Sequence, residues 1–355
     1  MKKRTTAQDV ADLAGVSRTT VSFVLNNVPG IRISDETRHR VSEAARQLDY
    51  HPDATARRMV KGRTSIIGFV LRQTPDQAFA DRFLPQVLHG LSRAAGTQGY
   101  HILIEPAPPD DSTSYLRLIR ERHVDGIVLS GPRFDDQELL HTLADGSSVV
   151  LMGQLPNTDL PFVDVDNVNG AAMVTRHLIE LGHQRIAFIS NAKPIYTASA
   201  DRLAGYQKAL AAAGIAFDEG LVRYGDFDPA SGETAMNDLL QLDPRPTAVF
   251  VASDTVAIGA LKAIRCAGLN VPRDMALVGF DDAPHSEFIE PPLTTVRLPA
   301  FGLGWGAGDL LIRLINKEVI RQPAILLETE LIVRKSCGAH PLLAAPSESH
   351  HKEGA

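Results

Sequence analysis

The sequence predicts a small all-α helix-turn-helix head followed by an α/β body of two doubly wound parallel-sheet lobes. Three observations lead to this fold class. The first 52 residues contain short amphipathic helical patterns separated by turn residues. From residue 64 onward, short apolar runs alternate with amphipathic stretches, which is typical of parallel strands covered by helices on both faces. At 355 residues the chain is also too long for one ordinary core.

The composition indicates a soluble globular protein, with 44% hydrophobic and 22% charged residues. The sequence lacks the run of about 18 apolar residues that a membrane span needs, and no apolar segment follows the charged N-terminus. We therefore expect no membrane span, no signal peptide and a cytoplasmic location. Cys266 and Cys337 have neither metal-site nor redox spacing. They are expected to be reduced and structural, and neither a metal nor a cofactor is predicted.

Charge is distributed unevenly along the chain. Residues 1–63 carry 12 Lys and Arg against 7 Asp and Glu, a net charge of +5. The remaining residues carry 24 against 35, a net charge of −11. A basic head on an acidic body suggests that only the head meets a polyanion.

The first two helices of the head are predicted on either side of Gly15. Thr6 is a candidate N-cap for a helix over 6–14, with Asp9 in the position of a capping box. Val10, Leu13 and Ala14 would form its apolar stripe. Gly15 suits a turn at positive φ, and Ser17 would cap a second helix that runs to Leu25. This pattern predicts a helix-turn-helix motif.

The polar side of the second helix carries the candidate DNA contacts. Arg18, Thr19, Ser22 and Phe23 could reach base edges in the major groove, since Arg pairs with guanine and Thr or Phe contacts the thymine methyl. Ser17, Thr20 and Asn26 are short polar groups suited to phosphate oxygens. The alternative is an ordinary αα-hairpin whose Arg18 is merely solvated.

A third helix is predicted from Ser34, an N-cap followed by acidic residues, to the Tyr50-His51-Pro52 end. Its inward face would contain Val41, Ala44, Ala45 and Leu48.

The body divides into two sets of strands and helices. In the first set, strands are predicted at 66–71, 101–105, 126–130 and 148–152, with helices near 82–98, 112–122 and 135–144. In the second, strands are predicted at 162–165, 185–190, 221–224, 247–252 and 275–280, with helices near 167–181, 199–213, 229–241 and 254–267.

Ligands of open α/β sheets bind beyond the carboxyl ends of the strands. The candidate effector-binding residues there are Arg72, Phe79, Asp164, Arg202, Phe227, Ser253 and Asp281. Carboxylates and an arginine can bond several hydroxyls while an aromatic ring stacks on a sugar face, so this set suits a neutral polyol. For Asp166, Asp254 and Asp282 the favoured interpretation is that they cap helices.

The motifs of the head resemble the signature of the LacI family of repressors. They are Asp9-Val10-Ala11, Ala14-Gly15-Val16-Ser17, Thr20-Val21-Ser22, Val24-Leu25-Asn26, Ser34-Asp35-Glu36-Thr37-Arg38 and Tyr50-His51-Pro52. The resemblance implies that residues 1–52 bind DNA and that residues 53–63 form a hinge helix and linker. Met59 stands where the family usually has a leucine that wedges into the minor groove, and methionine can also act as such a wedge. Phe23 is atypical for a base-reading position, so operator preferences do not transfer.

The resemblance continues through the body to about residue 338. Arg202-Leu203-Ala204-Gly205-Tyr206 and Gly279-Phe280-Asp281-Asp282 are similar to effector-contacting motifs of the family. It implies a periplasmic-binding-protein-like effector-binding and dimerisation domain at 64–340. Its lobes would be 64–161 plus 298–324 and 162–297 plus 325–340, and a disordered tail would follow at 341–355.

The function that the resemblance implies is a homodimeric repressor of carbohydrate-utilisation genes. A mono- or disaccharide would release it from a palindromic double-stranded operator. A purine- or nucleoside-responsive corepressor mechanism is the main alternative. A transport-linked sugar-binding protein would need a signal peptide and no head. An enzyme is disfavoured because the sequence has no phosphate-binding glycine loop, nucleophile elbow or HExxH motif.

Overall fold

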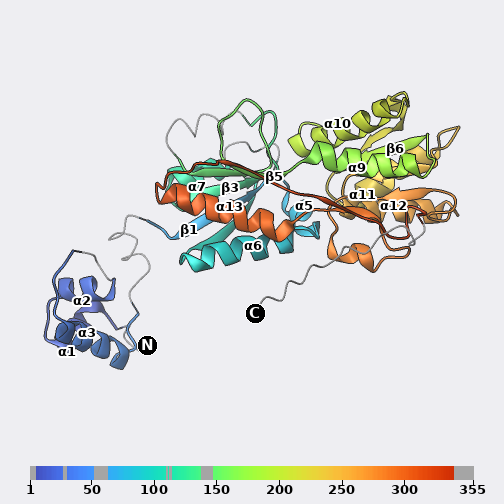
Figure 1. Cartoon of the computed structure of the whole chain (residues 1–355). Helices are drawn as coiled ribbons and strands as arrows, with labels where there is room; N and C mark the ends of the chain where they lie inside the picture. The colour runs from blue at the N-terminus through green and yellow to red at the C-terminus, as the bar shows by residue number, and fades with distance from the viewer. Residues whose placement is uncertain are drawn as a thin grey trace, which may run out of the picture. The chain divides into compact units, whose positions relative to one another are not determined.

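The computed structural model describes residues 5–26, 30–51, 63–108, 111, 114–136 and 147–339 (Figure 1). The chain forms two compact units that divide between Ser65 and Ile66, the head and the body. The predicted hinge helix with Met59 and the predicted tail at 341–355 lie outside the described residues. Most of the predicted helix near 135–144 also lies outside them.

The head consists of α1 (Ala7–Ala14), α2 (Arg18–Leu25) and α3 (Asp35–Gln47). Each helix begins at its predicted N-cap. The hydroxyls of Thr6, Ser17 and Ser34 each accept a hydrogen bond from the backbone amide three residues further on. Such a cap satisfies an amide that the first helical turn leaves without an intrahelical partner. Gly15 ends α1 at φ 64°, a conformation that costs glycine little.

The three helices of the head share one apolar core. It contains Val10, Ala11, Ala14, Val21, Val24, Val41, Ala44 and Ala45. The prediction that Leu13 belongs to this core is wrong, because its side chain is 52% exposed. With 3.6 residues per turn, Leu13 lies about 100° from the centre of the face formed by residues 10, 11 and 14.

The first lobe of the body is built on a six-stranded parallel sheet with the order β11-β5-β4-β3-β1-β2. Its strands are β1 (Ile66–Leu71), β2 (His101–Pro106), β3 (Gly126–Ser130), β4 (Val149–Met152), β5 (Phe162–Val165) and β11 (Ala324–Leu327). Its helices are α5 (Pro75–Ala80), α6 (Leu84–Thr97), α7 (Ser114–Arg120) and α13 (Ala300–Ile315). Helices α6 and α13 cover one face of the sheet, and α7 packs on the other (Figure 1).

The second lobe is built on a four-stranded parallel sheet with the order β7-β6-β8-β9. Its strands are β6 (Ile186–Ser190), β7 (Val222–Tyr224), β8 (Ala248–Val251) and β9 (Ala276–Val278). Helices α9 (Asn167–Glu180) and α10 (Thr197–Ala212) cover one face, and α11 (Pro229–Leu240) and α12 (Asp254–Cys266) cover the other. In both lobes the strand order reverses beside the first strand, at β1/β3 and at β6/β8. Such reversal points are where open α/β sheets bind ligands.

The lobe boundaries differ from the predicted ones. Strand β5 belongs to the first sheet, where Phe162 lies opposite Leu151 of β4. The segment from residue 325 onward, predicted to lie in the second lobe, begins in β11, which joins β5 in the first sheet, and continues into β12 (Glu330–Ile332). Strand β12 pairs antiparallel with β10 (Thr295–Arg297). Sheet membership depends on hydrogen bonds between distant segments, which the local apolar pattern does not encode.

Neighbouring helices approach closely at glycines. A β-carbon on Gly90 of α6 would overlap the carbonyl oxygen of Phe301 in α13, and one on Gly304 of α13 would overlap that of Val87 in α6. Gly205 makes the corresponding approach between α10 and α9. The absence of a side chain is therefore a packing requirement at these positions.

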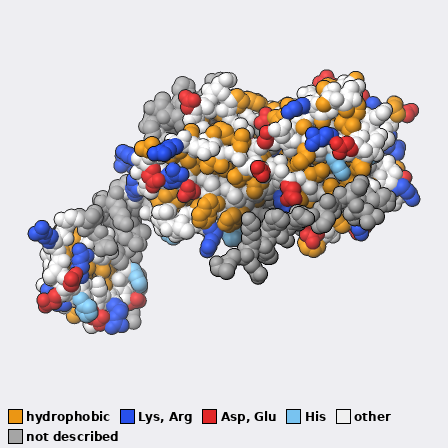
Figure 2. Space-filling view, in the orientation of Figure 1, with side chains coloured by type: hydrophobic (Ala, Val, Ile, Leu, Met, Phe, Trp, Pro, Cys, Tyr) orange, Lys and Arg blue, Asp and Glu red, His pale blue; other side chains and the backbone are white. Residues whose placement is uncertain are grey.

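Aromatic side chains lie on the face of the first lobe that carries α6 and α13. Trp305, the only tryptophan of the chain, stacks on Phe301 with ring centroids 6.2 Å apart and is 38% exposed. Figure 2 shows hydrophobic side chains along this face. None of the described helices has the length and apolarity needed to cross a membrane.

Candidate functional site

Helix α2 presents the predicted DNA contacts of the head. Arg18 and Thr19 are exposed near its N-terminus, and Ser22 and Phe23 are half-buried one turn later. The hydroxyls of Ser17 and Thr20 lie 2.9 Å apart, so they form a polar pair at the start of the helix.

Near the end of α2, the side-chain amide nitrogen of Asn26 donates to the hydroxyl oxygen of Ser22 at 3.2 Å. The side chains of α2 are thus available on one edge of the head, but their contact with bases remains a prediction.

A pocket lies between the two lobes, at the carboxyl ends of β1, β3, β6 and β8. Its cavity volume is about 140 Å³, roughly ten times the space that one water needs. The polar residues lining it are Arg72, Gln73, Asp81, Ser130, Asp164, Asn167, Asn191, Arg202, Ser253 and Asp281. The aromatic residues are Phe83, Tyr196 and Phe227.

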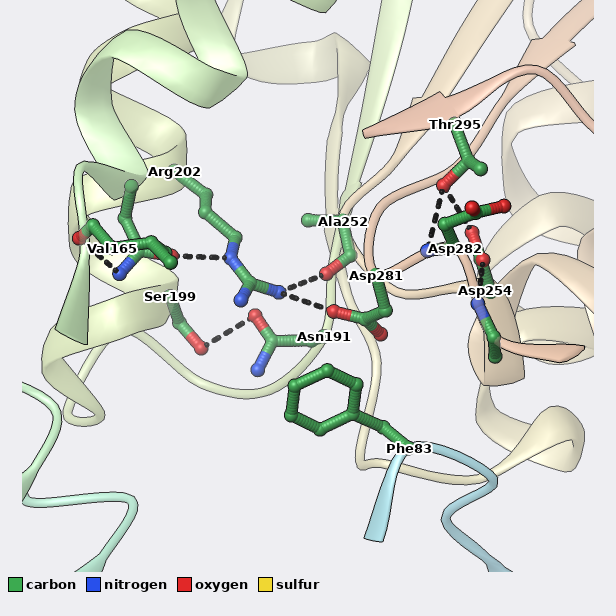
Figure 3. A network of polar contacts seen from close by, with 12 residues as sticks. Phe83, Val165, Asn191, Ser199, Arg202, Ala252, Asp254, Asp281, Asp282 and Thr295 are labelled. Carbon is green, nitrogen blue, oxygen red and sulfur yellow. Dashed lines mark hydrogen bonds and ion pairs between the residues drawn. The ribbon is translucent and has the colours of Figure 1, made fainter. Parts of the chain in front are cut away.

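Arg202 occupies the second-lobe side of this pocket (Figure 3). Its Nε donates to Asn167 Oδ1 at 2.9 Å, and one terminal nitrogen, Nη1, donates to the carbonyl of Ala252 at 2.6 Å. The same nitrogen lies 3.6 Å from the Asp281 carboxylate, and the guanidinium lies over the Phe280 ring at 4.1 Å. These contacts fix the plane of the guanidinium before any ligand arrives.

Three carboxylates surround Arg202. Burial raises the pKa of Asp281 well above its usual value and that of Asp164 to about 6. Burial also raises the pKa of Asp81, although Arg202 partly opposes this effect. Asp164 accepts from Gln154 at 3.1 Å and from Asn167 at 3.3 Å. The pocket therefore holds more acceptors than its one central guanidinium can satisfy.

Arg72 lines the pocket, but its guanidinium is engaged elsewhere. It pairs with Asp136 at 2.8 Å, and both side chains are 1% exposed. Its Nη1 donates to the carbonyl of Asp111 at 2.8 Å, and the group lies over the Tyr115 ring at 5.3 Å. Arg72 thus anchors the chain after β3, and a direct effector contact by its side chain stays a prediction.

The aromatic residues of the pocket come from both lobes. Phe227 lies edge-on to Tyr196, with ring centroids 5.0 Å apart. Phe83 reaches the pocket from the first lobe (Figure 3). The prediction that Phe79 lines the pocket is wrong, because that side chain is 66% exposed and lies outside the lining. Helix α5 buries Ala78, so the next residue points about 100° away.

The lobes are joined beside the pocket by residues 132–136 and 195–197, which we call the clasp. The amide of Phe134 donates to the carbonyl of Ile195 at 3.0 Å, and the amide of Thr197 donates to that of Pro132 at 3.2 Å. Tyr196 Oη donates to the carbonyl of Arg72 at 2.7 Å, and Arg133 lies over its ring at 5.2 Å. The clasp therefore ties the second lobe to the loops that follow β1 and β3.

Of the three aspartates expected to cap helices, Asp166 caps α9 by accepting from the Asn169 amide at 2.9 Å. Asp254 is fully buried at the first position of α12, where it accepts from Ala283, Ser286 and Thr295. Asp282 instead pairs with Arg297 and Arg334, each at 2.8 Å. Of the three, Asp166 is therefore the one whose side chain caps a helix as predicted.

Sequence reasoning missed Asp81, Phe83, Asn191 and Tyr196, which also line the pocket. Asn191 directly follows β6, so its position at a strand end was a usable signal. Asp81, Phe83 and Tyr196 lie in loops without a periodic pattern.

Both cysteines are free. Cys337 is buried beside Thr294, whereas Cys266 is exposed. No cluster of His, Cys, Asp and Glu able to hold a metal ion occurs in the described part of the chain.

Comparisons with known proteins agree with this architecture. Residues 6–53 match the model of the lacI family of bacterial regulatory proteins, and residues 175–337 match a periplasmic binding protein-like domain. The chain is 37% identical to the HTH-type transcriptional regulator CelR of Thermobifida fusca over 343 residues, covering 94% of this chain and 99% of CelR.

Two solved structures are also similar. A CelR–cellobiose complex has a TM-score of 0.72 and 36% identity, over 94% of this chain and 100% of that one. The lac repressor dimer bound to operator and the anti-inducer ONPF has a TM-score of 0.82 and 27% identity, over 95% of this chain and 100% of that one. With a helix-turn-helix head, a two-lobed body with a pocket between the lobes, and relatives that match over nearly its whole length, the chain belongs to the lacI family of bacterial transcriptional regulators.

Proposed function

We propose that this regulator is a homodimeric repressor of carbohydrate-utilisation genes that an uncharged mono- or disaccharide releases from a palindromic operator. The pocket between the lobes is the observation that carries this proposal. Arg202, Asp281 and Asp164 offer donors and acceptors that match hydroxyl groups, and Phe83 and Phe227 offer apolar walls. The existence of a solved CelR–cellobiose complex supports a sugar.

In this proposal the exposed end of α2 enters the major groove in the cytoplasm. Arg18, Thr19, Ser22 and Phe23 would contact bases, and Ser17, Thr20 and Asn26 would contact phosphates. Met59 would act in the minor groove at the centre of the site. A twofold dimer would present two such heads, which is the reason to expect a palindrome.

The test begins with operator selection from randomised duplexes by the full chain, followed by gel-shift titration in the presence of neutral mono- and disaccharides. We expect a twofold-symmetric site and release by one of the sugars. Arg202→Met keeps the side-chain volume but removes the donors, so the sugar should no longer release this variant. Arg176→Met, which alters an exposed arginine on α9, should respond like the original chain.

Other results would contradict the proposal in distinct ways. A sugar that strengthens operator binding would make the ligand a corepressor. A nucleobase or nucleoside that controls binding, with every sugar inactive, would replace the carbohydrate function by the purine-responsive one. An unchanged sugar response in Arg202→Met would remove Arg202 from the effector site.

A further inference from the structure

Acidic side chains outnumber basic ones around the pocket. Arg72 and Asp136 neutralise each other in a fully buried pair. The remaining central cation, Arg202, faces the carboxylates of Asp81, Asp164 and Asp281. Arg82, the neighbour of Asp81, is exposed and does not line the pocket. Burial already disfavours the charged forms of these three acids, so the further negative charge of an anionic ligand would be strongly unfavourable at this low local dielectric.

Asp81 differs from the other two carboxylates in the hydrogen bonds that its oxygens accept. Asp164 is bonded by Gln154 and Asn167, and Asp281 is bonded by Ser253 and paired with Arg202. Asp81 accepts one hydrogen bond, at 2.9 Å, from the backbone amide of Phe83. Within the described residues no side chain donates to it.

Asp81 lines the same pocket as Arg202 and interacts with it electrostatically. Asp81 ends α5 in the first lobe, whereas Arg202 belongs to α10 in the second. Phe83, two residues after Asp81, also lines the pocket, so this loop offers a carboxylate close to an aromatic ring. A hydroxyl group can donate to a carboxylate and accept from a guanidinium, which a phosphate or carboxylate group cannot do when ionised.

We infer that Asp81 is a specificity-determining residue of the effector site. Its carboxylate accepts a hydrogen bond from a hydroxyl of a neutral polyol and excludes phosphorylated and acidic sugars. This inference rests on the proposed sugar-responsive function and adds to it a residue and a chemical class of ligand.

The test compares neutral sugars with their 6-phosphates on the full chain, by thermal shift and then isothermal titration calorimetry. The panel contains glucose and cellobiose, each paired with its 6-phosphate. We expect a neutral sugar to bind and its phosphate to bind at least tenfold more weakly. Asp81→Asn, which retains the acceptor for the Phe83 amide, should weaken the neutral sugar about tenfold, the effect of one hydrogen bond to a charged group. It should also reduce the discrimination against the phosphate.

Asp76→Asn is the matched control, because it removes the same charge from an exposed position of the same helix. It should leave both affinities unchanged. If a sugar binds but Asp81→Asn leaves its affinity and the phosphate discrimination intact, the inference on Asp81 fails while the sugar-responsive function stands. If the phosphate binds as tightly as the neutral sugar, the exclusion is wrong. If no member of the panel binds, the sugar-responsive function and the inference fail together.

Discussion

At the scale of single residues, Asp164 shows how burial in the pocket favours the protonated form of an acid. Burial raises its pKa to about 6, from a usual value of 3.8. The folded protein thus binds this proton more tightly than the unfolded chain does. The contribution of Asp164 to stability is therefore fully present below its unfolded pKa and is lost as the pH rises through its folded pKa.

Replacing Asp164 by Asn should remove this pH dependence. Between pH 5 and pH 7.5, we expect the melting temperature of the ligand-free original chain to fall by about 2–4 °C more than that of Asp164→Asn, which corresponds to roughly 1 kcal/mol. Scanning calorimetry at constant ionic strength measures the difference. Asp159→Asn, at an exposed position in the same region, should behave like the original chain. Parallel curves for Asp164→Asn and the original chain would show that Asp164 does not titrate in this range.

Single residues could be predicted where a strand end or a family motif marks them. Asp164, Ser253, Arg202 and Asp281 line the pocket as the sequence predicted. Phe79 does not, because the rotational phase of the short helix α5 depends on which side packs against the lobe. That packing also brings Asp81 and Phe83 inward, and no local pattern encodes it.

The helices of the head illustrate what is predictable at the scale of elements. Thr6, Ser17 and Ser34 mark three helix starts because an N-cap acts within one turn. The close approach of α6 to α13 is different. Gly90 resembles any helical glycine in the sequence, and its role becomes visible only beside Phe301.

Gly90→Ala should destabilise the body by about 1–3 kcal/mol, because the new methyl group forces α6 away from α13. Urea unfolding of the full chain, followed by circular dichroism, measures the change.

Gly96→Ala on the same helix is the control, since a β-carbon there meets no atom within 4 Å. It should be neutral, or stabilising by roughly 0.5–1 kcal/mol. Equal effects of the two substitutions would argue against close helix packing as the reason for Gly90.

At the scale of the whole molecule, the alternating pattern was sufficient to predict two parallel-sheet lobes, but it did not locate their boundaries. Strands β5 and β11 are separated by the 158 residues from Asp166 to Pro323, yet they pair in register. Such pairing depends on the assembled sheet and on the segments that cross between the lobes. Fold class was therefore accessible to sequence reasoning, and the exact division of the lobes was not.

The clasp gives the two lobes a preferred arrangement without ligand. Thr197 is buried, and its Oγ1 donates to the carbonyl of Pro132 at 3.3 Å across the lobes. Thr197→Val removes this bond at nearly constant volume. The binding-competent arrangement should become less populated, and the affinity for the effector should fall by about 2- to 10-fold. Titration calorimetry measures the affinity, and small-angle scattering should show a larger radius of gyration.

Thr234→Val tests the same chemical change away from the clasp, since the Thr234 hydroxyl donates to the carbonyl of Ala230 within α11. It should alter neither measurement. An unchanged affinity in Thr197→Val would mean that the clasp bond does not contribute to the equilibrium between the lobes.

The single tryptophan gives this molecule an optical property of its own. Trp305 is half-exposed on α13, two residues beyond Leu303, which lines the pocket. Because no second indole contributes, every change in the tryptophan emission of the intact chain belongs to this one position. The protein therefore contains an intrinsic, label-free fluorophore on the helix that adjoins its ligand pocket.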